Sequence, residues 1–161
     1  MNRRTLLLLL ALAPAALAAR AQEPEATKAQ PELPKEQLTI VTKDGQRHPF
    51  NVELASTEAQ QLTGEMFRTS VPQDGGMLFV WPSVRDSPMW MKNTLVPLDM
   101  VFINPDGTIR HVAEDAVPQS LRVIESGGPV AATLELAGGT AARLGIAPGD
   151  KVLAPQFHGP G

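Results

Sequence analysis

Seven residues that are polar or carry a polar group stand inside otherwise apolar stretches of the chain, and these could do chemistry. They are Arg68, Trp90, Lys92, Asn93, Thr94, Asp99 and Glu135. An unpaired charge in apolar surroundings is costly, so a carboxyl group there needs a partner. We therefore expect these residues to form a polar pocket centred on Lys92, Asn93 and Asp99 that binds a small ligand.

The carboxyl groups also allow a second interpretation, a small acid–base enzyme of hydrolase type that uses Asp99 and Glu135. One of these two acids is then the general base, and Lys92 lowers its pKa. Arg68 holds an anionic or carbonyl-bearing substrate. A purely structural interpretation stays open as well, in which the two cations pair with the two acids and close the ends of the fold. No nucleophile accompanies the cluster, which favours binding or structure over catalysis.

The sequence predicts no metal and no cofactor. His48, His111 and His158 are isolated and lack chelating spacing. The glycine pairs do not form a nucleotide-binding loop, and no G-x-S-x-G motif is present. The methionines and Trp81 stand in apolar strand-like segments, where core packing is their expected role.

Residues 1–21 have the pattern of a signal peptide. Arg3 and Arg4 precede an apolar run at residues 6–17, and small residues allow cleavage after Ala18 or Ala21. The run is shorter than the roughly 20 residues that span a bilayer, so no stable membrane span is expected after cleavage. The sequence thus predicts a periplasmic or secreted protein. The paired arginines leave the twin-arginine route open beside the ordinary one.

Charge and cysteine content narrow the partners. The chain has 14 basic and 17 acidic residues, and the signal peptide contains three of the basic residues and none of the acids. An acidic mature protein has no basic stripe for nucleic acid or an anionic membrane surface. The chain has no cysteine, so its core alone must hold the fold. The expected partners are a small ligand or an envelope protein.

Hydrophobic alternation predicts one domain over residues 38–154, after a proline-rich disordered linker at 22–37 and before a flexible tail at 155–161. The predicted strands are residues 38–42, 50–54, 76–81, 98–103, 108–113, 130–136 and 151–154, and Asp44-Gly45 joins the first two as a hairpin. The predicted fold class is α+β and mostly β: a small barrel-like sheet, mixed or antiparallel, with one longer and one short helix.

The longer helix is expected over residues 56–68. Thr57 followed by Gln60 is a capping box, and apolar residues recur at helical spacing. Gly64 lowers helix stability, so either the helix ends there or a neighbouring chain comes close. The short helix is expected over residues 140–144, where Thr140 can cap it and Gly145 suits its C-terminal end.

Several ordered motifs together resemble one known family. They are Gly64-Glu65-Met66-Phe67-Arg68, Gly76-Met77-Leu78-Phe79, Trp90-Met91-Lys92-Asn93-Thr94 with Pro97-Leu98-Asp99, and Leu134-Glu135-Leu136. Over residues 38–153 the chain resembles the family of domain of unknown function 192. The resemblance implies a compact, barrel-like, mostly β domain, often exported, with no settled activity. Glu65 departs from the leucine usual in that motif; we expect it on the helix surface or in a slightly rotated helix, and assign it no role.

These observations leave three functions open. The first is a binding module of the periplasm or envelope that uses the polar pocket. The second is the acid–base enzyme. The third is a structural or chaperone-like factor in envelope assembly, which would carry a large exposed apolar patch.

Overall fold

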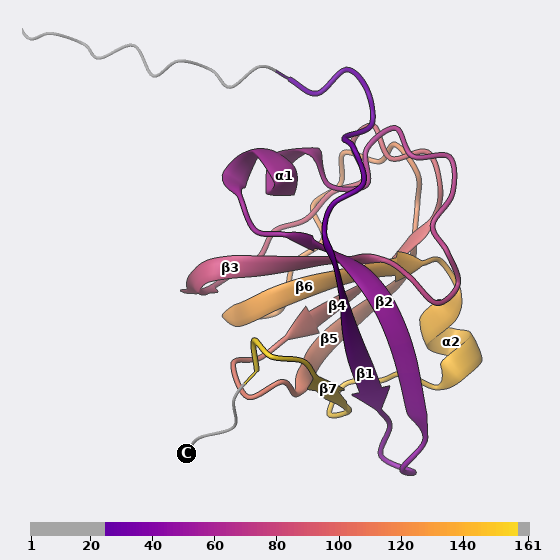
Figure 1. Ribbon diagram of the computed structural model, residues 1–161, viewed down its shortest axis with the longest axis vertical. Coiled ribbons are helices and arrows are strands. Elements are labelled where there is room, and N and C mark those ends of the chain that lie inside the picture. The colour runs from indigo at the N-terminus through magenta and orange to yellow at the C-terminus, as the bar shows by residue number, and fades with distance from the viewer. Residues whose placement is uncertain (1–24, 158–161) are drawn as a thin grey trace, which may run out of the picture.

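The computed structural model describes residues 25–157 (Figure 1). Their backbone forms seven strands and two helices. The strands are β1 (Lys35–Val41), β2 (Arg47–Ala55), β3 (Met77–Arg85), β4 (Leu98–Ile103), β5 (Ile109–Ala116), β6 (Val130–Ala137) and β7 (Lys151–Leu153). The helices are α1 (Glu58–Thr63) and α2 (Thr140–Leu144). The predicted signal peptide, residues 1–21, lies outside the described residues.

All seven strands lie in one sheet, in the order β5-β4-β6-β3-β2-β1-β7. Strands β2 and β3 run parallel, and the other neighbours are antiparallel. The sheet curls until its two edges approach, because Thr108, just before β5, pairs with Lys151 of β7. The predicted mostly β, barrel-like fold with a mixed sheet is confirmed, and the sheet is a curled half-barrel (Figure 1).

The two faces of the sheet bury different side chains. Along β4, Val101 and Ile103 belong to a cluster to which every strand contributes, so this cluster fills the inside of the curl. Leu98, Met100 and Phe102 belong to a second cluster on the outer face. Successive side chains of a strand point to opposite faces, and burying each large apolar one stabilises the fold by about 1.5–3 kcal/mol. Strand β4 therefore has a core on both sides.

Helix α1 is shorter than predicted. Its capping box is confirmed, because Thr57 accepts from the Gln60 N–H and the Gln60 side chain accepts from the Thr57 N–H. The helix ends at Gly64, where φ is +48° and a Cβ would lie 3.1 Å from the Phe79 ring. Close packing on β3 and this backbone angle stop the helix, so residues 65–68 are not helical and both helices are short. Figure 1 shows α1 and α2 at opposite sides of the sheet.

The described part of the predicted linker packs against the domain. Strand β1 begins at Lys35, three residues before the predicted start. The Leu33 N–H donates to Glu53, at 2.7 Å, and the Gln30 side chain donates to the Gly64 carbonyl, at 2.9 Å. The disordered linker is predicted from the composition of residues 22–37. In the structure, residues 35–37 pair with β2, and residues 30 and 33 make hydrogen bonds with the domain. Phe157 of the predicted tail also packs on the inner core.

Neither helix formed by residues 25–157 has the length and apolar character needed to cross a membrane.

A substitution at Gly76 tests the contact between β6 and the chain entering β3. Gly76 has φ +150°, and a Cβ there would lie 2.2 Å from the carbonyl oxygen of Glu135. We expect Gly76→Ala to lower the free energy of unfolding by about 3 kcal/mol or more, since that carbonyl is fixed in the sheet. In Gly45→Ala, at φ +84° with nothing within 4 Å, only the backbone strain of about 1–2 kcal/mol should be seen. Equal losses by urea denaturation would contradict the contact.

Candidate functional site

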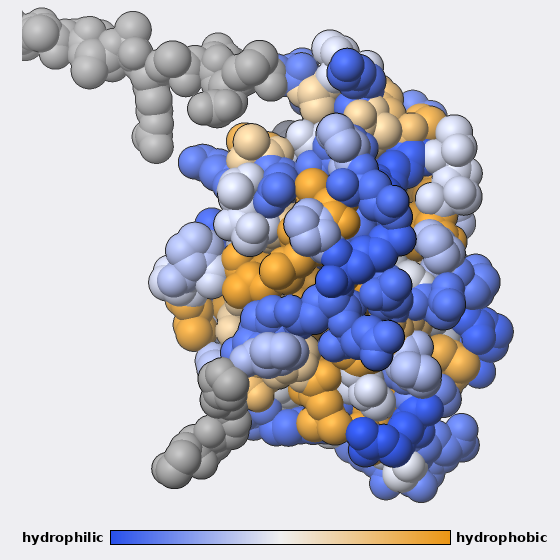
Figure 2. Space-filling view, in the orientation of Figure 1, coloured by the Kyte–Doolittle hydropathy of each residue, from blue (hydrophilic) through white to orange (hydrophobic). Residues whose placement is uncertain are grey.

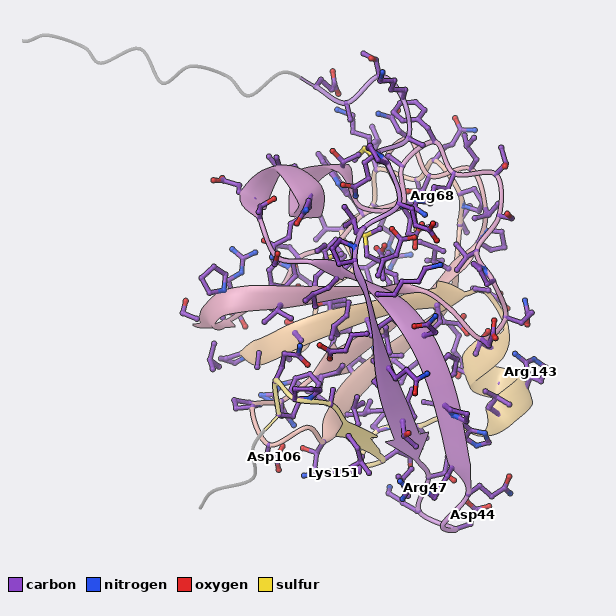
Figure 3. All side chains as sticks on the ribbon, in the orientation of Figure 1. Asp44, Arg47, Arg68, Asp106, Arg143 and Lys151 are labelled. Carbon is purple, nitrogen blue, oxygen red and sulfur yellow. The ribbon has the colours of Figure 1, made fainter. Side chains whose placement is uncertain are left out.

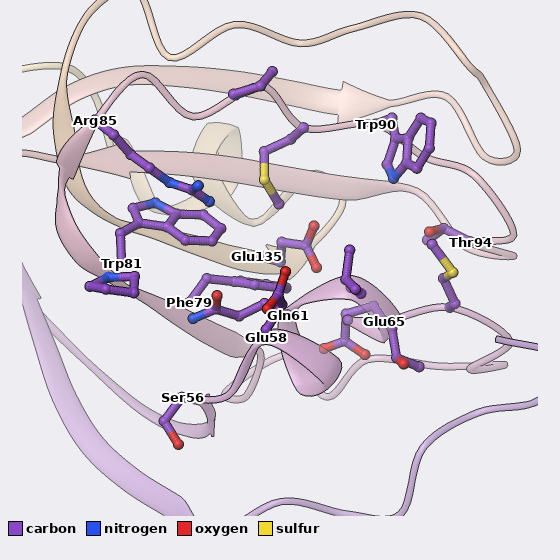
Figure 4. Close-up of a pocket in the computed structure, with 17 residues that line it drawn as sticks. Ser56, Glu58, Gln61, Glu65, Phe79, Trp81, Arg85, Trp90, Thr94 and Glu135 are labelled. Atoms are coloured by element: carbon purple, nitrogen blue, oxygen red, sulfur yellow. The ribbon is translucent and has the colours of Figure 1, made fainter. Parts of the chain in front are cut away.

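A cleft of about 500 Å³ opens on the outer face of the sheet, between α1, β3 and the segment 88–94. Figure 4 shows aromatic side chains on its walls and the carboxyl groups of Glu65 and Glu135 within it. Its lining includes Glu65, Phe79, Trp81, Arg85, Trp90, Thr94 and Glu135. A cavity of this size is typical of small-ligand sites, which span about 300–1,000 Å³.

Strand register places Glu135, which lines this cleft, in a row of four side chains. Glu53 on β2 pairs with Met77 on β3, and Met77 pairs with Glu135 on β6. Glu135 in turn pairs with Met100 on β4. Paired residues of neighbouring strands share a face, so these four side chains form one row on the outer face. Met77 separates the two glutamates, and strand spacing puts their Cα atoms on the order of 10 Å apart.

Glu135 is buried in this row without a partner. Its residue surface is 4 % exposed, and its Oε2 atom has no hydrogen-bond partner among residues 25–157. Burial raises the pKa of Glu135 well above its usual range, and repulsion from Glu65 adds to the effect. Glu135 therefore keeps its proton to a higher pH than an ordinary glutamate does.

Glu65 reaches the cleft because it directly follows Gly64, the residue that caps the C-terminal end of α1. The turn at Gly64 directs Glu65 inward, and the residue is 3 % exposed. Burial raises the pKa of Glu65 from 4.5 to about 7, Arg68 opposes this rise, and Glu53 adds to it. A carboxyl group with this pKa gains and loses its proton near neutral pH.

Arg68 is shared between two acids, which explains why Glu65 is not held ionised. Its terminal nitrogens bind both oxygens of Glu53, at 2.6 and 2.8 Å. Its Nε atom lies 3.1 Å from Oε2 of Glu65, but this ion pair lacks the geometry of a hydrogen bond. The bidentate pair with Glu53 uses most of the guanidinium. Figure 3 places Arg68 at the end of the molecule far from Arg47 and Asp44.

The aromatic wall of the cleft comes mainly from β3. The rings of Phe79 and Trp81 have centroids 5.9 Å apart. The guanidinium carbon of Arg85 lies 4.3 Å from the centre of the Trp81 ring, a cation–π contact that is visible in Figure 4. Trp90 lines the cleft across from β3, and this residue is 47 % exposed to solvent. A ligand could thus contact aromatic faces on two sides.

The structure brings three of the seven predicted site residues together in this cleft: Trp90, Thr94 and Glu135. Arg68 lies behind Glu65, as described above. Thr94 is buried, and its hydroxyl donates to the Lys92 carbonyl at 3.3 Å.

Lys92 and Asn93 lie beside the cleft and make other contacts. Lys92 forms an ion pair with Glu25 and lies 5.3 Å from the centre of the Trp90 ring. Asn93 adopts φ +55°, and its carbonyl accepts from the Phe67 N–H at 2.8 Å. Asparagine tolerates this left-handed conformation, so its role here is to shape the loop.

Asp99 lies on the other face of the sheet, apart from the cleft. It pairs with Leu136 on β6, whose side chain belongs to the inner core. Asp99 is fully buried and accepts backbone hydrogen bonds from Asp115, Gly139 and Ala141, at 2.8, 3.1 and 2.7 Å. These bonds hold β5 and the start of α2. Asp99 therefore does not share the predicted pocket with Lys92 and Asn93, and it does not form an acid–base pair with Glu135, because adjacent strand positions face opposite ways.

Glu65 and Glu53 also lie in this region, and neither is among the predicted site residues. Glu65 is expected on the helix surface or in a slightly rotated helix, but α1 ends at Gly64, the alternative that the glycine left open, and this turns Glu65 inward. Glu53 alternates with Val52 and Leu54 in β2, a pattern that by itself predicts a solvent-facing position, so its burial could not be predicted from that strand alone. The register that aligns it with Glu135 could not be read from either strand alone.

The arrangement favours ligand binding and proton exchange. Among residues 25–157, no group of three or more histidine, aspartate or glutamate residues is placed to hold a metal ion. The cleft instead offers hydrogen-bonding carboxyl groups on an apolar, aromatic background, which is the usual composition of a small-molecule site.

The raised pKa of Glu65 makes stability depend on pH. Between pH 4.5 and 7 the folded state binds more protons than the unfolded chain at this position, so stability falls as pH rises. Compared with the parent, Glu65→Gln should gain about 3 kcal/mol over this window, and Glu135→Gln should shift in the same direction. Urea denaturation at several pH values measures this. A difference from the parent that is independent of pH would contradict the burial of these carboxyls.

Replacing Asp99 separates structure from binding. Asp99→Ala leaves three backbone N–H groups without their acceptor, and we expect a loss of about 3–5 kcal/mol in the free energy of unfolding. The control Asp86→Ala changes an exposed aspartate and should stay within about 0.5 kcal/mol of the parent. If Asp99→Ala melted like the parent, its structural role would be refuted.

Comparisons with known proteins agree on the family. The DUF192 family, described as "Uncharacterized ACR", matches residues 39–154. A crystal structure from Sinorhizobium meliloti, described as that of a candidate transcription regulator, is 46% identical, with a TM-score of 0.75, over 78% of this chain and 97% of that one. A second, from Novosphingobium aromaticivorans and of unknown function, is 42% identical, with a TM-score of 0.73, over 76% and 86%. No curated protein matches. The chain belongs to the DUF192 family.

Proposed function

We propose that this protein is an exported binding module that holds a small ligand in the cleft between α1, β3 and Trp90. The observation that carries the proposal is the pair of buried carboxyl groups, Glu65 and Glu135, each with an oxygen that has no hydrogen-bond partner among residues 25–157. Export is inferred from the signal-peptide pattern of residues 1–21. The family and the fold leave the ligand open.

Buried polar atoms without hydrogen-bond partners favour a ligand site, because they destabilise the folded state unless a bound molecule supplies the missing partners. Leaving one buried acceptor without a donor costs about 1–3 kcal/mol, and proteins leave few such groups. Here Glu135 and the Trp81 N–H have such atoms, and Oε2 of Glu65 has only the ion pair with Arg68, which lacks hydrogen-bond geometry; all three residues line one cleft. A bound molecule can supply the missing partners, whereas a purely structural role would place partners within the chain, as it does for Asp99.

A second candidate function is acid–base catalysis in the same cleft, with Glu65 in the role predicted for Asp99. The pKa of Glu65, about 7, suits a group that takes and returns a proton at neutral pH. Glu135, which holds its proton more strongly, would be the acid of such a pair. Turnover of a bound molecule, lost in Glu65→Gln, distinguishes this function from binding.

Two other functions receive less support. An envelope assembly factor would present a large apolar surface, and on the face shown in Figure 2 hydrophobic residues are interrupted by hydrophilic ones. Transcription regulation, the description given to the relative from Sinorhizobium meliloti, concerns that protein. In this chain acidic residues outnumber basic ones, which disfavours a DNA partner.

A ligand screen by thermal shift tests the proposal. A molecule that occupies the cleft at 100 times its Kd should stabilise the purified protein by about 2.7 kcal/mol. Trp90→Ala removes a half-exposed wall of the cleft and should weaken any such ligand, whereas Leu121→Ala, at an exposed residue outside the cleft, should not. Ligands that bind Trp90→Ala as well as the parent would place the site elsewhere. No stabilising molecule in a broad metabolite set would count against a small-ligand module.

A further inference from the structure

We infer that the ligand of this cleft is a small organic cation, an alkylammonium or guanidinium group on an apolar body, with its charge between Glu65 and Glu135 and its body against Trp81 and Trp90. This inference rests on the proposed function and adds the chemical class of the ligand.

The charges within the cleft are unbalanced whenever both carboxyl groups are ionised. Glu65 and Glu135 repel each other, and the only cation in contact with either of them among the described residues is Arg68. Arg68 is bound through both terminal nitrogens to Glu53, so it balances Glu65 in part and does not contact Glu135. One bound cation would relieve the desolvation of both carboxylates and their mutual repulsion. An anion would increase the repulsion, and a neutral molecule would leave it.

Two aromatic residues of the cleft, Trp81 and Trp90, already contact cations of the chain itself. Arg85 lies 4.3 Å above Trp81, and Lys92 lies 5.3 Å from the centre of the Trp90 ring. Both distances fall within the roughly 6 Å over which a cation is attracted to a ring face. The two rings therefore attract positive charge, and a ligand that packs its apolar body on Trp81 must use ring surface that Arg85 does not cover.

The remaining charged groups near the site do not replace such a ligand. Glu58 of α1 and Arg85 of β3 line the cleft, while Glu53 and Arg68 stand behind Glu65. Among the described residues Arg85 forms no ion pair with an acid. Arg68 is thus the one cation paired with Glu65 among the described residues, and Glu135 has none when it is ionised.

Binding of a cation must then release protons. In the free protein, Glu65 and Glu135 keep their protons to a higher pH than an ordinary glutamate does, because the pKa of each is raised. A cation favours their ionised forms, so each carboxyl that ionises on binding gives its proton to the solvent. By linkage, affinity for the cation must rise with pH until the carboxyls are ionised in the free protein. A neutral ligand would release no protons.

Isothermal titration with three probes of one shape tests the inference: 2-phenylethylammonium, neutral 2-phenylethanol and anionic 3-phenylpropanoate. We expect the cation to bind at least about tenfold more tightly than the alcohol, and the anion to bind most weakly. Titrations in buffers of different ionisation enthalpy should show proton release with the cation alone. A lysine side chain, offered as N-acetyl-lysine amide, tests whether a peptide can supply the same charge.

Variants separate the carboxyl groups from the rest of the cleft. Glu135→Gln keeps the size of the side chain, and should reduce both the affinity for the cation and the number of protons released. Trp90→Ala should weaken all probes. Glu114→Gln makes the same chemical change at an exposed residue outside the cleft and should alter neither quantity. If Glu135→Gln did not fold, the buffer series on the parent protein would still decide the result.

The outcomes distinguish this inference from the function on which it rests. Equal binding of the alcohol and the cation, or binding of the cation without proton release, would overturn the cation and leave a small-ligand cleft in place. Failure of every probe, together with neutral or anionic hits in the thermal-shift screen, would do the same. Failure of every probe and of the screen would overturn both.

Discussion

The central constraint in this structure is the position of β6, which passes through the middle of the sheet with a core on each side. Because its side chains alternate, Leu134 and Leu136 fill the inside of the curl and Glu135 must enter the outer core. No donor among residues 25–157 meets the Oε2 atom of Glu135. The cleft opens above this carboxyl group. The turn after Gly64 brings Glu65 into the same cleft, and Arg68 pairs with Glu65 and Glu53 beside it.

Asp99 and Glu135 are buried carboxyl groups on opposite faces of the sheet, and they differ in their hydrogen bonding. Asp99 is buried among three backbone N–H groups, so its charge is fully used in joining β4, β5 and α2. Glu135 lies one strand away on the outer face, where side chains surround it and backbone donors are taken by the sheet. Burial alone therefore does not mark a functional acid. The contrast between a satisfied and an unsatisfied carboxyl is more informative, since buried unsatisfied groups are few and each needs an explanation.

The strands were largely predictable from the sequence, and the site was not. Alternation of apolar residues located all seven strands, and Asp44-Gly45 located the first hairpin, because both signals are local. The site depends on register between β2, β3 and β6, which are far apart in the sequence and joined by loops that local patterns do not specify. Glu135 was chosen for its apolar surroundings and does line the cleft. Asp99 was chosen on the same ground, and only the pairing of β4 with β6 separates the two.

The most direct test of this account is a titration of the glutamate side chains of the free protein by carboxyl carbon NMR. The account requires that Glu65 titrate near pH 7 and Glu135 well above the usual glutamate range. Assignment through Glu65→Gln and Glu135→Gln identifies each resonance. Ordinary titration of both Glu65 and Glu135 would show that their charges are already balanced, and the case for a ligand in this cleft would fail.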